Sequence, residues 1–350
     1  MKKVLNFLYG IYDLIKEFLF RWGLKILLIL FIGMVIHNLL KMSEITSRYK
    51  GDYKRLQLVD TENKKMMNVY TVGTGEKTIV IMPGFGSQSP VIQYKAIADG
   101  LKDQYRVVII EYLGYGFSMG TSKERTSENI VNEMIAGLNE AGILGPYVLM
   151  PHSLSNVYAM KMQQMYPSLV QGIISIDGKC PSELNETYYY DLNNETVTNI
   201  KLTAVLELTG FERVLCYVSP KTFYIDRMQN MTSVYNAEDI KIYRNRLSSS
   251  YLTLTMVREI DKMMSNMDEM KEYTYPDYLH VLTILSQETV DTYQENVNVN
   301  GAVKNLMEYA EKPVSNPSIQ RIVTITGDHM LNITNPVEVV SNAKAFLASF

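Results

Sequence analysis

A serine near the middle of the chain lies between a strand pattern and a helix pattern. The run Tyr147–Met150 is short and apolar, as a buried strand is, and apolar side chains recur at helical spacing after Ser155. Ser153 falls at the turn between them. A tight strand-to-helix turn pushes a serine hydroxyl out of the sheet edge, and the N–H groups that begin the helix can hold negative charge developing on a substrate. Ser153 is therefore the predicted nucleophile.

The residues around this serine depart from the usual G-x-S-x-G pattern of such a turn. Pro151 and Ser155 occupy the two glycine positions. Ser155 is small and fits, whereas Pro151 lacks an N–H and weakens the ladder at the end of the strand. The segment Pro-His-Ser-Leu-Ser would also suit an ordinary serine-rich helix cap. The remainder of the chain has to decide between the two interpretations.

A serine nucleophile needs a base, and the chain contains only four histidines. His37 lies in an apolar N-terminal stretch, and His152 adjoins the serine on a turn where neighbouring side chains point apart. His280 begins a predicted strand and so lies at the wrong end of the sheet. His329, just past the last predicted strand, remains as the predicted base.

The carboxylate that orients this base is open among three residues. Glu288 and Asp291 follow the apolar run Val281–Leu285, and Asp177 follows the preceding strand. Glu288 is favoured because it lies nearest a rigid strand end, with Asp291 next and Asp177 last. All three lie between the serine and the base in chain order, where the acid usually lies.

Backbone N–H groups are the expected donors to an oxyanion. One is that of Leu154, directly after the serine, and the other would come from the loop after Thr78–Met82, where Gly84 and Gly86 permit an unusual turn around Phe85. The loop Pro-Gly-Phe-Gly lacks both the dinucleotide and the P-loop patterns. No cofactor and no metal are expected.

The elements that position these residues alternate between strands and helices. This alternation predicts an α/β protein with a mostly parallel central sheet covered on both faces, whose ligand lies at the carboxyl ends of the strands. The predicted strands are Arg55–Val59, Met66–Val72, Thr78–Met82, Arg106–Ile110, Tyr147–Met150, Gly172–Ile176, Val281–Leu285 and Arg321–Ile325, the first two forming a hairpin. The predicted helices are Val91–Leu101, Thr126–Ala141 and Val337–Phe346.

The pattern also predicts three parts of the chain. Residues 50–177 and 277–350 form the core, and residues 178–276, rich in Tyr, Met and Asn, form a helical lid over the strand ends. Its expected helices are Ile200–Leu208, Asp239–Leu247 and Thr253–Met264. Residues 1–45 carry a single membrane anchor around Leu24–Leu40, close to the roughly 20 apolar residues that span a bilayer. A buried soluble helix is the alternative.

Charge and cysteine content limit the partners and the compartment. With a net charge of −3 over 350 residues, the chain lacks the excess of basic residues that is typical of nucleic-acid-binding proteins. Basic residues lie closer before the apolar stretch than after it, which weakly favours a catalytic domain on the extracellular side. Cys180 and Cys216 lack metal-ligand spacing, and two separate thiols are favoured over an extracellular disulfide.

From about Lys54 to Phe350 the chain resembles the α/β-hydrolase family. TIVIMPGFGSQSP is similar to its oxyanion strand and loop, with Pro83 where histidine is common, and VVIIEYLGYGFS is similar to its D-x-x-G-x-G-x-S stretch, with Glu111 for aspartate. YVLMPHSLSNVYAMKMQQMYPSLVQGIISID and GDHMLNITNPVEVVSNAKAFL resemble the nucleophile and histidine segments. The resemblance implies the roles of Ser153, His329, Phe85 and Leu154 and an inserted lid. The acid segment SQETVD departs from the usual G-x-x-D.

These residues predict a serine hydrolase of a carboxylic ester or related acyl bond, amides and thioesters included, acting through an acyl-enzyme at Ser153. Its expected partners are an apolar small-molecule acyl substrate and the membrane. Two alternatives remain open at this point. One is a catalytically inactive binding module at the membrane, suggested by the altered glycines, and the other is an acyltransferase that uses the same residues.

Overall fold

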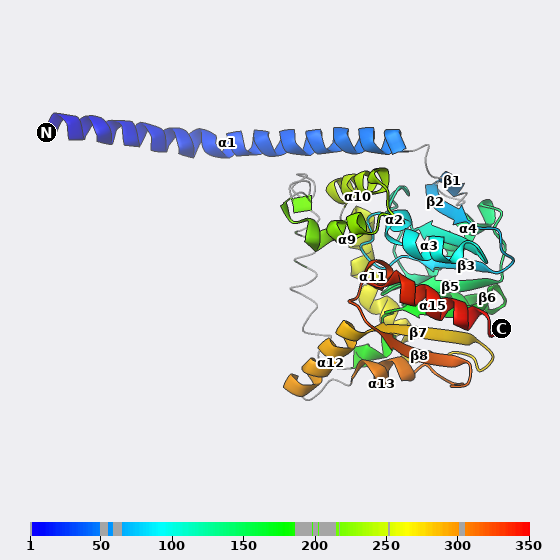
Figure 1. The fold of residues 1–350 in the computed structure, drawn as a ribbon. Coiled ribbons are helices and arrows are strands. Elements are labelled where there is room, and N and C mark those ends of the chain that lie inside the picture. Colours follow the sequence, from blue (N-terminus) through cyan, green and yellow to red (C-terminus); the bar gives the residue numbers. More distant parts are fainter. Residues whose placement is uncertain are drawn as a thin grey trace.

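A computed structural model describes residues 2–49, 55–58, 65–185, 198, 202, 215, 216, 218–250, 253–300 and 305–350. Within these residues eight strands form one sheet, in the order β1-β2-β4-β3-β5-β6-β7-β8 (Figure 1). β1 and β2 pair antiparallel, as does β2 with β4, and all other pairs are parallel. The strands are β1 (Arg55–Leu58), β2 (Lys65–Val72), β3 (Thr78–Met82), β4 (Arg106–Glu111), β5 (Tyr147–Pro151), β6 (Val170–Ile176), β7 (His280–Ser286) and β8 (Gln320–Ile325).

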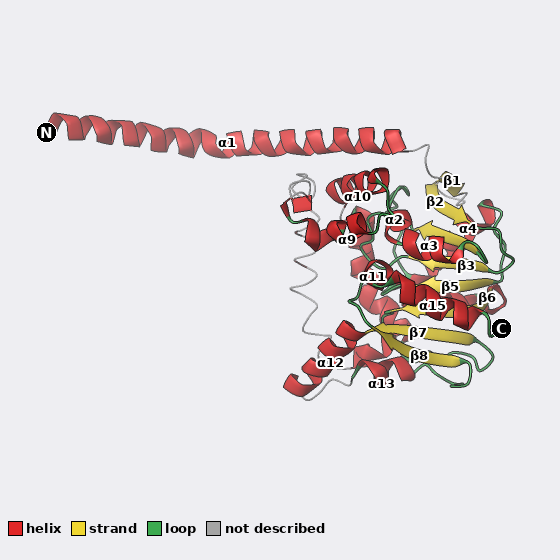
Figure 2. Cartoon of the chain, in the orientation of Figure 1, coloured by secondary structure: helices red, strands yellow, loops and turns green. Residues whose placement is uncertain are grey.

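Helices cover both faces of the sheet and one end of its strands (Figure 2). The fold class expected from the alternating pattern, a mostly parallel sheet between helices, is therefore confirmed. The helices are α1 (Lys2–Tyr49), α2 (Pro90–Gln93), α3 (Lys95–Leu101), α4 (Ser127–Glu140), α5 (Ser155–Met165), α9 (Ile225–Asn230), α10 (Ala237–Ser250), α11 (Leu254–Met270), α12 (Gln287–Asn300), α13 (Leu306–Glu311), α14 (Leu331–Thr334) and α15 (Pro336–Leu347), with short 3-10 turns η1 (Pro167–Leu169), η2 (Pro181–Asn185) and η3 (Pro220–Phe223).

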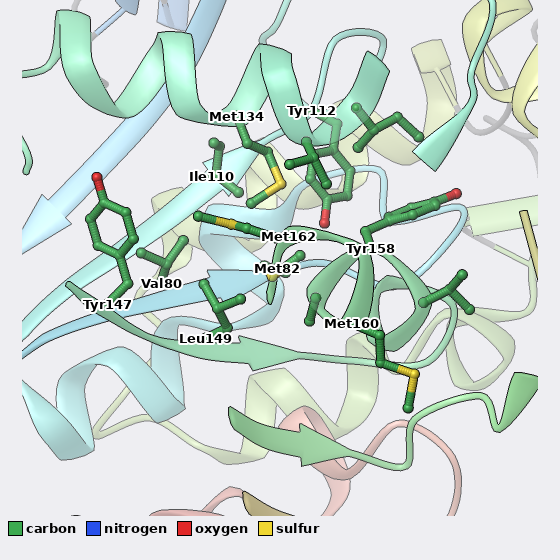
Figure 3. Close-up of a cluster of buried hydrophobic side chains, with 14 of the residues drawn as sticks. Val80, Met82, Ile110, Tyr112, Met134, Tyr147, Leu149, Tyr158, Met160 and Met162 are labelled. Atoms are coloured by element: carbon green, nitrogen blue, oxygen red, sulfur yellow. The ribbon is translucent and has the colours of Figure 1, made fainter. Parts of the chain in front are cut away.

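Alternate side chains of each central strand enter two separate cores. Val80 and Met82 of β3 pack with α4, α5 and α11 (Figure 3), whereas Ile79 and Ile81 pack with α3 and α15 on the opposite face. A strand buried on both faces must be apolar at every position, because successive side chains point to opposite sides. This requirement explains the continuous apolar run of β3.

The predicted elements match the structure closely, with two informative differences. The helix expected at Val91–Leu101 is divided at Tyr94, whose backbone angles (φ −102°, ψ 8°) separate α2 from α3. The helix α12, which is not among the predicted helices, begins directly at the end of β7, where the hydroxyl of Ser286 accepts a hydrogen bond from the N–H of Thr289.

Among the described residues between β6 and β7, the helices α9, α10 and α11 lie beyond the carboxyl ends of the strands (Figure 1). α10 and α11 contain the expected helices Asp239–Leu247 and Thr253–Met264, whereas the expected helix Ile200–Leu208 lies, apart from Leu202, outside the described residues. α11 is joined to the core by buried polar side chains. The carboxylate of Glu259 accepts hydrogen bonds from the hydroxyls of Tyr115 (2.9 Å) and Tyr158 (2.8 Å).

The N-terminal helix α1 projects from the body of the molecule and passes α10 (Figure 1). Its stretch Tyr9–Leu40 is 32 residues long, apolar, and not buried by the rest of the chain. This exceeds the roughly 20 residues that cross a bilayer. By length and composition, α1 is therefore capable of spanning a membrane, and the helix begins earlier than the stretch Leu24–Leu40 suggested.

Candidate active site

The turn after β5 has the strained geometry expected of a nucleophile elbow. Ser153 has φ +53°, in the left-handed region of backbone conformation that residues other than glycine rarely adopt. Its N–H donates to the carbonyl of Ile176 (3.1 Å), and its own carbonyl accepts from the N–H of Lys179 (3.0 Å), so β6 and its following loop hold the turn. α5 begins two residues later. Such strain persists only where surrounding contacts enforce it, and it is concentrated at functional sites.

Three side chains from the ends of three strands meet above this turn. The Nε2 atom of His329, after β8, lies 2.9 Å from the Oγ atom of Ser153. Its Nδ1 atom lies 2.7 Å from the Oδ2 atom of Asp177, after β6. With the Nδ1–H donated to the carboxylate, Nε2 is free to accept the serine proton. The structure thus brings the predicted nucleophile and the predicted base together.

Asp177 is the carboxylate at this imidazole, so the preference for Glu288, with Asp291 second, is wrong. Both of those residues are exposed on α12, and Asp291 accepts a hydrogen bond from Gln287 instead (2.8 Å). The helix begins so close to the end of β7 that its carboxylates face solvent. Asp177, with φ +41°, occupies the tight turn after β6, where its side chain reaches His329.

The carboxylate of Asp177 is held on several sides. It accepts hydrogen bonds from the N–H of Ser286 (2.8 Å) and the hydroxyl of Thr289 (2.7 Å). Burial opposes its charged form, but the hydrogen bond and charge of His329, together with these donors, outweigh burial and hold the pKa of Asp177 below its ordinary value. Two sequence features could have identified this acid. One is the Asp-Gly pair directly after β6, and the other is the Ser-x-x-Thr helix start directly after the neighbouring strand β7.

The loop after β3 approaches the serine through glycine. A Cβ atom on Gly84 would lie 2.6 Å from the Nδ1 atom of His152 and 3.2 Å from the Cβ atom of Ser153, so a side chain does not fit there. The N–H of Gly84 is already donated to the hydroxyl of Tyr94 (3.0 Å). Within the described residues, the N–H groups of the two predicted oxyanion donors, Phe85 and Leu154, have no hydrogen-bond acceptor.

Ser155, predicted only to be small, has a second role that the sequence did not reveal. Its hydroxyl donates to the carbonyl of Pro83, and it accepts in turn from the buried hydroxyl of Tyr112 (2.8 Å). The departure from glycine therefore adds a bond between the start of α5 and the loop that carries Phe85. His280, excluded as base, stacks on Phe350 at the opposite end of the sheet (4.2 Å between ring centroids).

A pocket of about 560 Å³ opens over Ser153 and His329. The loops after β3, β5 and β8 form one wall, and the segment around η3 with α10 forms the other. Most of its surface is apolar. The lining residues are Gly84, Phe85, Gly86, Ser87, Gln88, Gln93, His152, Ser153, Leu215, Thr222, Phe223, Tyr224, Tyr243, Leu247, His329 and Met330. In the part of the chain that is described, no three His, Cys, Asp or Glu side chains gather as metal ligands would.

Comparison with known proteins gives the class of this fold. Residues 77–200 match the family model described as the alpha/beta hydrolase fold, a region that contains β3 through β6 and Ser153. Together with the sheet order and the strand-end site, this match shows that the chain has the α/β-hydrolase fold.

Individual similar proteins extend this likeness beyond the matched region. The chain is 23% identical to the uncharacterized protein YbdG of Bacillus subtilis, over 92% of this chain and 94% of that protein. The epoxide hydrolase VrEH1 of Vigna radiata shares the fold with a TM-score of 0.60 at 14% identity, over 85% of this chain and 98% of that structure. A thermophilic esterase of Thermogutta terrifontis gives 0.55 at 17%, over 85% and 98%. Hydrolases of two kinds thus share this architecture.

Proposed function

We propose that this protein is a serine hydrolase that cleaves a carboxylic ester or related acyl bond through an acyl-enzyme at Ser153. The observation that carries the proposal is the continuous chain from the serine hydroxyl through both nitrogens of His329 to the carboxylate of Asp177, with distances of 2.9 and 2.7 Å. The imidazole is partly exposed toward the pocket, whereas the carboxylate is buried. This is the arrangement that a base and its orienting acid require.

Each step uses a group already in place. Ser153 Oγ attacks the acyl carbon while its proton passes to Nε2 of His329, and Asp177 stabilises the imidazolium. The N–H groups of Phe85 and Leu154 hold the oxyanion. Collapse of the tetrahedral intermediate gives the Nε2 proton to the leaving alcohol and leaves the acyl group on Ser153. Water, deprotonated by Nε2, then releases the acid and restores the serine.

The chemistry of serine favours acyl transfer over epoxide opening, although an epoxide hydrolase shares the fold. An alkoxide that opened an epoxide would end as an ether on Ser153. No carbonyl would then be present for water to attack, so the enzyme would stop after one event. An acyl ester on the same oxygen is hydrolysed with the same base and the same oxyanion donors.

The apolar pocket and α1 support an apolar substrate handled at a membrane. In this proposal residues 1–45 anchor the protein, residues 50–177 and 277–350 form the catalytic core, and residues 178–276 form a lid that covers the pocket. Lys16, Arg21 and Lys25 precede most of the apolar stretch and support an extracellular catalytic domain. Protease accessibility of the folded domain in intact cells would test that orientation.

The test is labelling of the full-length protein with a fluorophosphonate probe, followed by hydrolysis of p-nitrophenyl esters of increasing chain length. The wild type is expected to label and to hydrolyse, and Ser153→Ala is expected to do neither. Ser118→Ala, outside the site, is the matched control and should label normally. Absence of labelling in folded wild type would contradict the proposal and favour a binding module. Labelling with release only to an added alcohol would instead favour an acyltransferase.

A further inference from the structure

His152 is a buried titratable residue that the proposed mechanism does not use. It directly precedes the nucleophile, and its side chain is 2% exposed. Its Nδ1 atom lies 2.8 Å from the hydroxyl oxygen of Tyr94, and its Nε2 atom lies 2.8 Å from the carbonyl oxygen of His329. One ring therefore contacts residues from two sides of the active site.

The hydrogen-bond partners determine which nitrogen carries the proton. The carbonyl of His329 can only accept, so Nε2 must donate to it. The hydroxyl of Tyr94 accepts from the N–H of Gly84 (3.0 Å) and can donate its own hydrogen to Nδ1. Burial, followed by the charge of His329, lowers the pKa of His152 to about 3, against smaller opposing effects of the His329 carbonyl and of Asp177. The neutral form with its hydrogen on Nε2 thus satisfies every bond.

We infer that His152 is a positioning residue that links the loop carrying the oxyanion donor Phe85 to the loop carrying the base His329. The link runs from Gly84 N–H through Tyr94 and the His152 ring to the His329 carbonyl. These loops follow β3 and β8, which are not neighbours in the sheet. The inference rests on the proposed function. If His152 has this role, the N–H of Phe85 and the imidazole of His329 keep a fixed separation while negative charge develops on the substrate oxygen and positive charge develops on the imidazole.

The rings of His152 and His329 also pack against each other, with centroids 4.8 Å apart and planes inclined by 33°. The groups facing His152 are Tyr94, His329 and, through its charge, Asp177. A residue that merely fills this space would support folding but would leave the rate per folded site unchanged. A positioning residue would change that rate. The two roles are therefore separable by experiment.

The experiment measures kcat and KM per fluorophosphonate-titrated site with p-nitrophenyl butyrate. His152→Phe keeps the ring volume and removes both bonds, and kcat per site is expected to fall about 10- to 100-fold with KM within about threefold. Tyr94→Phe, which removes the bonds of the hydroxyl to Gly84 and to Nδ1 of His152 but leaves Nε2 on the carbonyl of His329, should lower kcat about 3- to 30-fold. The double variant should resemble His152→Phe, because both changes break one link. His152→Gln, whose amide can donate and accept, should recover part of the rate.

His280→Phe is the matched control, since it removes a histidine at the far end of the sheet, and its kcat per site should match wild type. Unchanged kcat per site in both His152→Phe and Tyr94→Phe, or additive losses in the double variant, would overturn the inference. If His152→Phe does not fold, Tyr94→Phe and His152→Gln decide the matter on their own.

A second measurement separates this inference from the proposed function. Nitrogen-15 NMR of the histidines should show His152 neutral, with its hydrogen on Nε2, and without titration between pH 5 and 8. The signal should change in Tyr94→Phe, whether or not the protein hydrolyses esters. A His152 that titrates in this range would overturn the link, whereas failure of the wild type to label with fluorophosphonate would overturn only the hydrolase.

Discussion

The two walls of the pocket are built by different means. On the sheet side, directional hydrogen bonds fix the reacting groups, as between Asp177 and the N–H of Ser286 or between Ser155 and the carbonyl of Pro83. On the opposite side, Phe223, Tyr243 and Leu247 belong to an apolar cluster that extends from α9 and α10 to α2. Chemistry needs atoms at defined angles, which hydrogen bonds provide. A wall that receives an apolar group needs mainly shape, which packing provides.

The two walls are nevertheless fastened together around the pocket. Lys95 on α3 contacts the carboxylate of Asp239 on α10, and the guanidinium groups of Arg227 and Arg246 donate to the carbonyls of Thr334 and Gly116. α11 is joined more deeply, through Glu259. Changes on the sheet side should therefore affect rate, changes on the α10 side should affect substrate choice, and changes at α11 should affect stability.

The largest expected effect is on the sheet side, at the orienting acid. Asp177→Asn should lower kcat about 10⁴-fold, because an amide cannot stabilise the imidazolium and favours the wrong tautomer of His329. Glu288→Gln and Asp291→Asn are matched controls and should stay within about threefold of wild type. Rates per titrated site on a p-nitrophenyl ester would measure this. A larger loss in Glu288→Gln than in Asp177→Asn would contradict the observed geometry.

The next effect is on the attachment of α11. Burial raises the pKa of Glu259, and its carboxyl group accepts from two buried tyrosine hydroxyls. Glu259→Ala should reduce the free energy of unfolding by about 3 kcal/mol, because it leaves both donors without an acceptor. Glu269→Ala, on the exposed face of the same helix beside Lys161, should cost less than about 1 kcal/mol. Urea unfolding would compare them, and equal losses would mean that the buried contact does not anchor α11.

A smaller effect is expected on the α10 wall. Leu247→Ala enlarges the apolar side of the pocket without touching the reacting groups. KM for a long-chain ester should rise about tenfold, as expected for losing roughly two buried methylene groups, while kcat on an acetate ester should change less than twofold. Leu254→Ala, at an exposed position, is the control. An equal loss on short and long esters would show that this wall also takes part in catalysis.

The most gradual effect is a pH dependence of stability that originates in His152. Its pKa is about 3 in the folded protein and near the ordinary value of about 6.5 when unfolded. Between these pH values the unfolded chain binds a proton at His152 that the folded chain does not bind. The contribution of neutral His152 to the free energy of unfolding is therefore complete above about pH 6.5, and it falls by about 1.4 kcal/mol per pH unit as the pH decreases below that value.

His152→Phe should flatten that acid dependence, as measured by urea unfolding between pH 7 and 4.5. Asp177, whose folded pKa lies below its ordinary value, supplies stability that is present above about pH 4 and is lost only at lower pH. It therefore does not overlap this range. An unchanged slope in His152→Phe would show that another group is responsible.

The sequence predicted what depends on local pattern. Strand runs such as Thr78–Met82 coincide with the observed strands, and Ser153 and His329 followed from their place at strand ends. The acid did not, because the choice depended on the left-handed turn at Asp177 and on how soon α12 begins. The hydrogen bonds of Ser155 and His152 were also missed, since their partners are distant in sequence and become neighbours only when the sheet closes.

The hydroxyl of Ser155 has a consequence for the redesign of this protein. Rewriting Ser155 as the glycine common at that place would look like a repair, and the small volume would be preserved. It would instead delete the only side-chain donor described on the carbonyl of Pro83 and leave the Tyr112 hydroxyl facing an empty space. In this molecule the departure from the motif at Ser155 therefore supplies specific hydrogen bonds that glycine could not make.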